Sequence, residues 1–239
     1  DLTGVVHAVG GGADSFALGD EVLGWSDERS SQAELVAVPA TQLTPKPSVM
    51  SWEAAGSLFV AGTAALASVE AVAPRRGETV VVSAAAGGVG SIAVQLAVLR
   101  GATVIGLASE RHHEWLRAND IVPVAYGDGQ AERITAAAGG VDAFMDTFGG
   151  GYVDLALDLG VAPERINTII DFAAAQRHGC KTQGTYSIAS AARLAELAEF
   201  VADGKLDVAI AGVYPLDQVR DAYRELESRH TLGKIVLVP

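Results

Sequence analysis

Residues 79–100 read TVVVSAAAGGVGSIAVQLAVLR, and this stretch decides the fold. Its opening is β-branched and apolar, which predicts a buried strand, whereas Ile92, Leu96 and Leu99 recur at the spacing of one helix face. The small residues 84–90 lie between the two. Strand, glycine loop and helix in this order predict a diphosphate cradle, because backbone N–H groups approach the ligand closely there and the helix N-terminus adds unpaired donors.

The surroundings of this loop strengthen the prediction. A second apolar strand is expected at 103–107, just after Gly101, and it completes one βαβ unit. Glycine holds two places of the usual G-x-G-x-x-G pattern, at positions 87 and 90, and alanine the first, at position 85. Small residues also serve close helix–strand packing, which is the alternative reading. We expect the diphosphate to contact Ala86, Gly87, Gly88, Val89 and Gly90.

Alternating strands and helices continue to about residue 184. Strands are expected at 122–125, 143–146 and 166–170, with helical segments between them, and this alternation predicts an α/β fold with a parallel doubly wound sheet. The dinucleotide-binding domain is accordingly assigned to residues 51–184.

Both ends of the chain are rich in short strands and turns. The N-terminal strands are expected near 4–6, 20–24 and 34–38, and helical spacing then runs from 52 to about 72. Beyond residue 184 we expect two helices, a strand near 208–210 and a final strand at 234–238. Residues 1–50 and 185–239 are assigned to one smaller domain, in which the two sets of strands are expected to pair into one sheet system.

Composition excludes several functional classes. The 239 residues carry a formal net charge of −12, which disfavours nucleic acid and anionic lipid as partners. No apolar stretch reaches the roughly 18 residues that a bilayer crossing needs, so no membrane association is expected. Cys180 is the single cysteine, so no intrachain disulfide can form, which suits a cytoplasmic protein.

Four motifs in order resemble the medium-chain dehydrogenase/reductase superfamily, and within it the zinc-free quinone oxidoreductase branch. They are FALGDEVLG at 16–24, the loop at 85–90, DTFGG at 146–150 and the closing LESR…GKIVL. The resemblance implies a Rossmann domain and a GroES-like β-barrel domain. Family members carry several dozen further residues before the segment that resembles 1–6, so the GroES-like domain is expected to be partial. Because that N-terminal part usually supplies pocket residues, we assign no catalytic residue.

The resemblance also bears on zinc. Asp1 and Phe59 stand where zinc-dependent relatives place ligands, and no cysteine precedes Cys180. Zinc requires three or four converging nitrogen, sulfur or oxygen ligands. We therefore expect no metal.

Residues 108–111, ASER, follow the second strand, where such folds bind the adenosine ribose. Arg111 matches the basic position of NADP-using relatives, Ser109 adds a hydroxyl donor, and Tyr126 matches a tyrosine that borders the same phosphate. Glu110 favours the alternative, because an acidic side chain here binds the ribose hydroxyl of NAD. We expect NADPH.

Further residues follow from their positions. Thr63 matches a family position beside the nicotinamide, although a threonine in a helix also serves local hydrogen bonding. Phe148 and Gly149 at a strand end suit the adenosine side of the cofactor, or else form a tight turn. Trp25 and Tyr186 are interpreted as packing residues rather than pocket residues.

These features predict NADPH-dependent reduction of quinones or α,β-unsaturated carbonyl compounds by hydride transfer without zinc. One alternative is a pathway-specific enoyl reductase with the same cofactor site. Another is a non-catalytic NADPH-binding redox sensor or structural protein. The resemblance implies a homodimer, with the strand at 166–170 or its neighbours as the candidate edge.

Overall fold

The computed structural model describes all 239 residues, which form two compact units. Unit 1 comprises Asp1–Thr63 and Ile188–Pro239, and unit 2 comprises Ala64–Ser187. The division falls within helix α2 (Phe59–Val72). None of the helices combines the length and the apolar character that a bilayer crossing requires.

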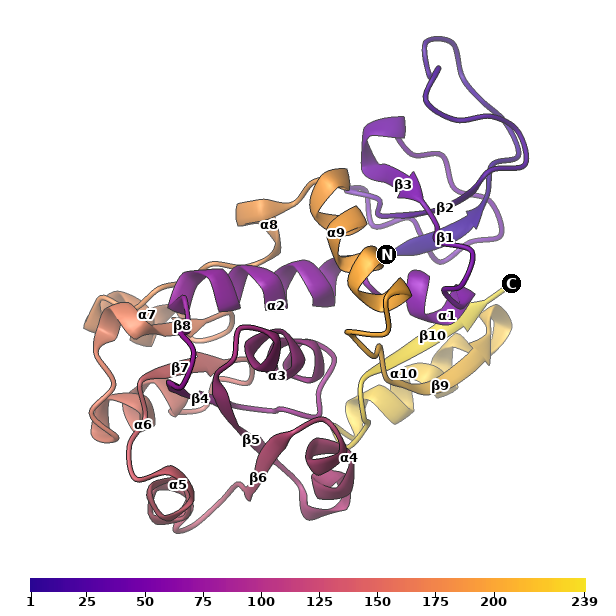
Figure 1. Ribbon diagram of the computed structural model, residues 1–239. Helices are drawn as coiled ribbons and strands as arrows, with labels where there is room; N and C mark the ends of the chain where they lie inside the picture. The colour runs from indigo at the N-terminus through magenta and orange to yellow at the C-terminus, as the bar shows by residue number, and fades with distance from the viewer. The chain divides into compact units, whose positions relative to one another are not determined.

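A five-stranded parallel sheet forms the centre of unit 2, in the order β6-β5-β4-β7-β8 (Figure 1). The chain enters at β4 in the middle, moves outward to β6 and returns to β7 on the other side of β4. The doubly wound sheet is confirmed, and its topological switch point lies between β4 and β7. The strands are β4 (Thr79–Val82), β5 (Thr103–Ala108), β6 (Ile121–Ala125), β7 (Ala143–Asp146) and β8 (Ile166–Thr168).

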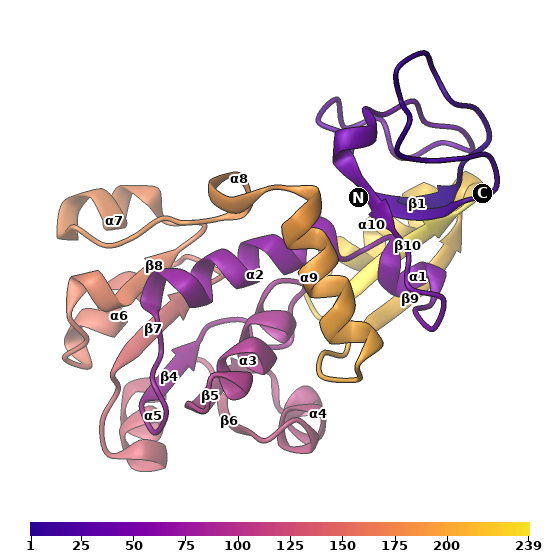
Figure 2. The same cartoon turned by 45° about the horizontal axis from the view of Figure 1, so that its top comes forward.

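Helices cover both faces of this sheet, with α3 and α4 on one side and α5 and α6 on the other (Figures 1 and 2). Ile105 and Leu107 of β5 are fully buried in the cluster that contains Ile134 of α5. A Cβ at Gly106 would point to the opposite face, toward Leu116 of α4. Burial on both faces explains why these strands read as continuous apolar runs. The helices are α3 (Gly90–Leu99), α4 (His113–Ala118), α5 (Gln130–Ala138) and α6 (Tyr152–Asp158).

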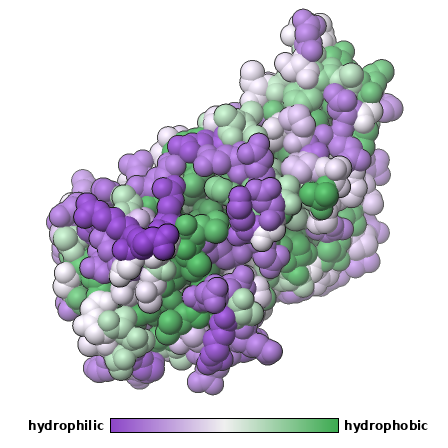
Figure 3. Space-filling view, in the orientation of Figure 1, coloured by the Kyte–Doolittle hydropathy of each residue, from purple (hydrophilic) through white to green (hydrophobic).

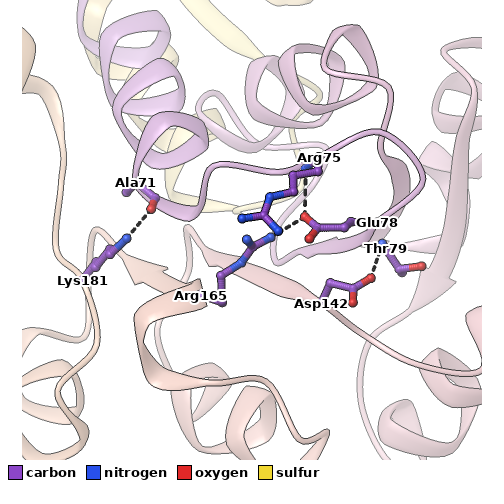
Figure 4. A network of polar contacts seen from close by, with 7 residues as sticks. All are labelled: Ala71, Arg75, Glu78, Thr79, Asp142, Arg165 and Lys181. Carbon is purple, nitrogen blue, oxygen red and sulfur yellow. Dashed lines mark hydrogen bonds and ion pairs between the residues drawn. The ribbon is translucent and has the colours of Figure 1, made fainter.

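Polar contacts tie together the amino-terminal edge of the sheet (Figure 4). Just before β4, the Glu78 carboxylate accepts the backbone N–H of Arg75 at 2.8 Å and pairs with the Arg165 guanidinium at 2.5 Å. Asp142, just before β7, accepts the N–H of Thr79 at 2.7 Å. The contacts join the starts of β4, β7 and β8, and they leave the carboxyl edge free for other roles.

The outer edge of β8 is already occupied. Lys181 donates its N–H to the Ile166 carbonyl at 2.9 Å and accepts the N–H of Thr168 at 3.0 Å, while its Nζ donates to the Ala71 carbonyl at 2.6 Å (Figure 4). These backbone groups of β8 cannot also pair with a second chain. The homodimer stays a prediction, and Ile166 and Thr168 are excluded as its pairing positions.

The surface in Figure 3 mixes polar and apolar side chains, with apolar surface prominent over the middle of unit 2, where Figure 1 draws α3 and β5. Leu99, Val122 and Phe148 are among the exposed apolar residues of this unit. Single exposed apolar side chains are normal on protein surfaces. Of these three residues, Phe148 lies just beyond the carboxyl end of β7.

Unit 1 contains both chain ends, but their strands form two separate sheets. The antiparallel sheet has the order β1-β2-β3, and β9 pairs in parallel with β10, so the expectation of one sheet system is wrong. The predicted strand at 34–38 is irregular, because no neighbouring segment supplies a hydrogen-bonding ladder. The strands are β1 (Leu2–Val5), β2 (Glu21–Gly24), β3 (Leu43–Pro45), β9 (Ile210–Pro215) and β10 (Lys234–Val238).

The helical stretch predicted from residue 52 onward is two helices. Ser51 caps the first by accepting the N–H of Ala54 at 3.2 Å, and this helix ends at the cap residue Gly56. The Ser57 hydroxyl donates to the Glu53 carbonyl, and α2 then begins at Phe59. The remaining helices are α1 (Trp52–Ala55), α7 (Phe172–His178), α8 (Thr185–Ile188), α9 (Ala191–Ala202) and α10 (Val219–Glu227).

Candidate nucleotide-binding site

With one exception, the residues predicted to bind a dinucleotide follow the carboxyl ends of strands in unit 2. Ligands of open α/β sheets bind outside these ends, at the switch point. Four segments distant in sequence are therefore brought to one edge of the sheet. Ala86–Gly90 follow β4, Ser109 and Arg111 follow β5, Tyr126 follows β6, and Phe148 and Gly149 follow β7.

The exception is Thr63, which lies in α2 within unit 1. It is fully buried, and its hydroxyl donates to the Phe59 carbonyl one helical turn earlier at 2.5 Å. The local hydrogen bond named as the alternative is present. A place beside the nicotinamide stays a prediction for Thr63.

The glycine loop turns back sharply toward α3. Ala84 takes a left-handed conformation with φ of 45°, and its carbonyl accepts the N–H of Gly87 at 2.8 Å. A Cβ on Gly90 would lie 2.1 Å from that same carbonyl oxygen. The absence of a side chain at Gly90 is therefore a requirement of the turn. The N–H of Ala85 donates to the Leu107 carbonyl at 2.9 Å, which seats the loop against β5.

The loop presents unpaired donors. The backbone N–H groups of Gly88, Val89 and Gly90 have no acceptor within unit 2, and no side chain caps the start of α3. Such N–H groups at a helix start carry the positive end of the helix dipole. A diphosphate supplies the acceptor oxygens and negative charge that these donors lack.

The ends of β5 and β6 lie side by side, because Ala108 and Ala125 are register partners. Ser109 and Tyr126 follow these partners directly. The Arg111 side chain is exposed and forms no ion pair, although Glu110 precedes it. The Ser109 hydroxyl makes no capping hydrogen bond. A guanidinium without an ion-pair partner suits a phosphate better than a neutral ribose hydroxyl.

A buried carboxylate organises the end of β7. Asp146 is 1% exposed, and its Oδ1 accepts the Ser83 hydroxyl at 2.8 Å and the N–H groups of Phe148 and Gly149 at 3.0 and 2.9 Å. Its Oδ2 accepts the Thr168 hydroxyl at 2.7 Å. Ser83, Asp146 and Thr168 end or follow three neighbouring strands, so one side chain connects β4, β7 and β8.

This network limits how Phe148 and Gly149 can meet a ligand. Their N–H groups are used by Asp146, which leaves the Phe148 ring, about half exposed, as the available surface. The ring packs edge-on against Tyr152 at 6.1 Å between centroids. Burial raises the pKa of Tyr152, and the nearby Asp146 carboxylate and Tyr126 raise it further. Tyr152 thus stays a neutral phenol that supports the Phe148 ring.

Sequence reasoning missed the roles of Ser83, Asp146 and Thr168. The available signal was a polar residue at the end of each of three buried strands.

Trp25 is confirmed as a packing residue, since it is 9% exposed and stacks on Phe59 at 4.0 Å. Tyr186 is 84% exposed, so its interpretation as a packing residue is wrong. Tyr186 is the second residue of the short helix α8, and no neighbouring element covers its side chain.

The positions compared with zinc ligands have other partners. Phe59 belongs to the stack on Trp25, and the Asp1 carboxylate accepts the N–H of Val60 at 3.1 Å. No group of three or more His, Cys, Asp or Glu side chains comes together as a metal site in this chain.

Comparisons with known proteins agree with this architecture. The family described as zinc-binding dehydrogenase matches residues 116–237. The synaptic vesicle membrane protein VAT-1 homolog of Rattus norvegicus is 30% identical over 99% of this chain and 67% of its own length.

Two solved structures share the fold over 99% of the chain. The quinone oxidoreductase from Coxiella burnetii is 27% identical with a TM-score of 0.86, and the match covers 78% of it. Mycobacterial Rv1454c, complexed with NADPH, is 27% identical with a TM-score of 0.84, and the match covers 81% of it. Together with the parallel sheet, the glycine loop and the family match, these similarities show that the chain belongs to the medium-chain dehydrogenase/reductase superfamily of oxidoreductases.

Proposed function

We propose that the protein binds NADPH at the carboxyl edge of the unit 2 sheet and reduces quinones or α,β-unsaturated carbonyl compounds without zinc. One observation carries the proposal. The unpaired N–H donors at the start of α3 follow β4, and the unpaired Arg111 cation follows the adjacent strand β5. The diphosphate and the 2′-phosphate of one molecule can be bound together at these two strand ends.

The residues present fit this cofactor. The side-chain-free position at Gly90 lets backbone come close to the diphosphate, and Gly88, Val89 and Gly90 supply its N–H donors. Ser109 and Arg111 would hold the 2′-phosphate, with Tyr126 bordering it. The mycobacterial neighbour complexed with NADPH supports the choice of nucleotide.

NADPH supplies a hydride when bound. The acceptor takes up that hydride and one proton from water, so a quinone becomes a hydroquinone and an enone becomes a saturated carbonyl. Negative charge on the acceptor delocalises to its oxygen, where hydrogen-bond donors suffice to stabilise it. The quinone oxidoreductase neighbour supports this substrate class.

The test is nucleotide oxidation by the full-length protein. NADPH and NADH are mixed separately with a panel of quinones and enones, and loss of reduced-nicotinamide absorbance is followed. We expect substrate-dependent oxidation with a lower KM for NADPH. If neither nucleotide is oxidised with any member of the panel, or if neither nucleotide binds, the proposed function is refuted.

A matched pair of variants tests the cofactor preference. Arg111→Ala removes the proposed phosphate ligand, whereas Arg117→Ala removes another exposed arginine, from the last turn of α4. We expect Arg111→Ala to raise the KM for NADPH about tenfold or more, as loss of a charge-assisted hydrogen bond does, and to leave the KM for NADH nearly unchanged. Equal effects of the two variants would contradict the assignment.

A further inference from the structure

We propose that Asp146 is a positioning residue that couples the glycine-loop end of β4 to the segment Phe148–Gly151, and so sets the spacing of the two strand ends at which the nucleotide binds. This inference rests on the proposed function. Asp146 itself contacts no ligand in this scheme, because four protein donors occupy its carboxylate.

The coupling runs through Ser83, which directly follows β4. Its hydroxyl donates to Asp146 Oδ1 at 2.8 Å and accepts the N–H of Thr147 at 2.9 Å. The Thr147 hydroxyl donates back to the Ser83 carbonyl at 2.7 Å. Together with the backbone hydrogen bond from the Ser83 N–H to the Met145 carbonyl at 3.0 Å, four hydrogen bonds of Ser83 thus cross the switch point between β4 and β7, and Ser83 is fully buried. Displacement of one strand end is therefore transmitted to the other.

The segment after β7 needs such an anchor. Gly149, Gly150 and Gly151 all have positive φ, at 83°, 70° and 93°. Glycine gains more conformational freedom on release than any other residue, so consecutive glycines hold a defined path only when other groups fix them. Asp146 fixes this path at its start by accepting the N–H groups of Phe148 and Gly149.

The same carboxylate has a second side that does not face the switch point. Thr168 donates to Oδ2, and its oxygen accepts the N–H groups of Ile170 and Asp171 at 3.2 and 2.9 Å. This side connects β7 with β8. The hydroxyls of Ser83 and Thr168 are both fully buried. The Ser83 hydroxyl therefore belongs to the proposed nucleotide-positioning role, and the Thr168 hydroxyl belongs to a purely structural one.

The experiment compares Ser83→Ala with Thr168→Val in the full-length protein. Each variant deletes one buried hydroxyl bound to Asp146. NADPH is titrated by fluorescence, steady-state kcat and KM are measured, and thermal unfolding reports stability. We expect Ser83→Ala to raise the Kd and KM for NADPH about tenfold, the equivalent of one hydrogen bond, with kcat changed less than about twofold. Thr168→Val should leave the Kd within about twofold at an equal or larger loss of stability.

The outcomes separate the two proposals. Suppose that the wild-type protein binds NADPH, but that both variants weaken binding equally, or only in proportion to their loss of stability. Asp146 is then purely structural and the positioning role is refuted, while the proposed function stands. If the wild-type protein binds no nicotinamide nucleotide, the proposed function fails and this inference fails with it. Asp146→Asn provides a second measurement, because it keeps the shape and replaces one acceptor oxygen with a donor; NADPH binding equal to that of the wild type would also refute the role.

Discussion

Gly90→Ala is the sharpest test of the glycine loop. The added Cβ would lie 2.1 Å from the Ala84 carbonyl oxygen, 2.8 Å from its carbon and 3.0 Å from the Ala85 Cα. All three are backbone atoms, so no rotamer change relieves the contact. Close carbon–oxygen contacts stand at about 3.3 Å, so the loop or the start of α3 must move by about 1 Å. We expect a displacement of that size at the binding site to weaken NADPH binding about 100-fold. Overpacking of this kind lowers the free energy of unfolding by about 1–3 kcal/mol.

NADPH titration and chemical denaturation measure both effects. Gly140→Ala is the matched control, because Gly140 lies in open space without a positive φ, and neither affinity nor stability should fall there. Gly87→Ala is an intermediate case, since its Cβ would lie 3.2 Å from the same Ala84 oxygen. If Gly90→Ala bound NADPH as tightly as the wild type and unfolded at the same denaturant concentration, the close approach at this turn would be refuted.

Three further predictions concern single side chains. Ala84→Val should lower the free energy of unfolding by about 1–3 kcal/mol in urea denaturation, because a β-branched residue resists the left-handed conformation, whereas Ala84→Gly should be tolerated. The backbone N–H of Arg75, and then the Arg165 guanidinium, hold the pKa of Glu78 below its ordinary value near 4.5, so this carboxylate stabilises the fold above that pH and loses its contribution as pH falls through the lower folded pKa. Glu78→Gln should therefore destabilise the protein by about 1 kcal/mol at pH 7 and flatten the fall in melting temperature at acid pH. Phe148→Ala should weaken NADPH binding with little loss of stability, since its ring is half exposed; a melting temperature lowered without any change in Kd would assign the ring to packing alone.

Local chemistry explains which parts of the fold could be predicted. The β-branched run, the small residues and the helical spacing of 79–100 act over a few neighbouring positions, and the strand, loop and helix appear where the pattern placed them. Helix α7 was missed although its signals are local: Asp171 caps it by accepting the N–H of Ala174, and Gly179 ends it with φ of 73°. Its alanine-rich body lacks the large apolar periodicity on which the prediction depended.

By itself, the sequence determined the α/β class, the glycine loop, and the segments that follow each strand of the sheet, because these depend on residue types at short spacing. Tertiary structure decided which of those segments share an edge, since strand order follows from packing between distant residues. It also decided the partners of the buried polar groups. Asp146 opens the DTFGG motif, but nothing in the chain pairs it with Ser83 or Thr168. The three residues form one network because a buried carboxylate must find its donors among neighbouring strands.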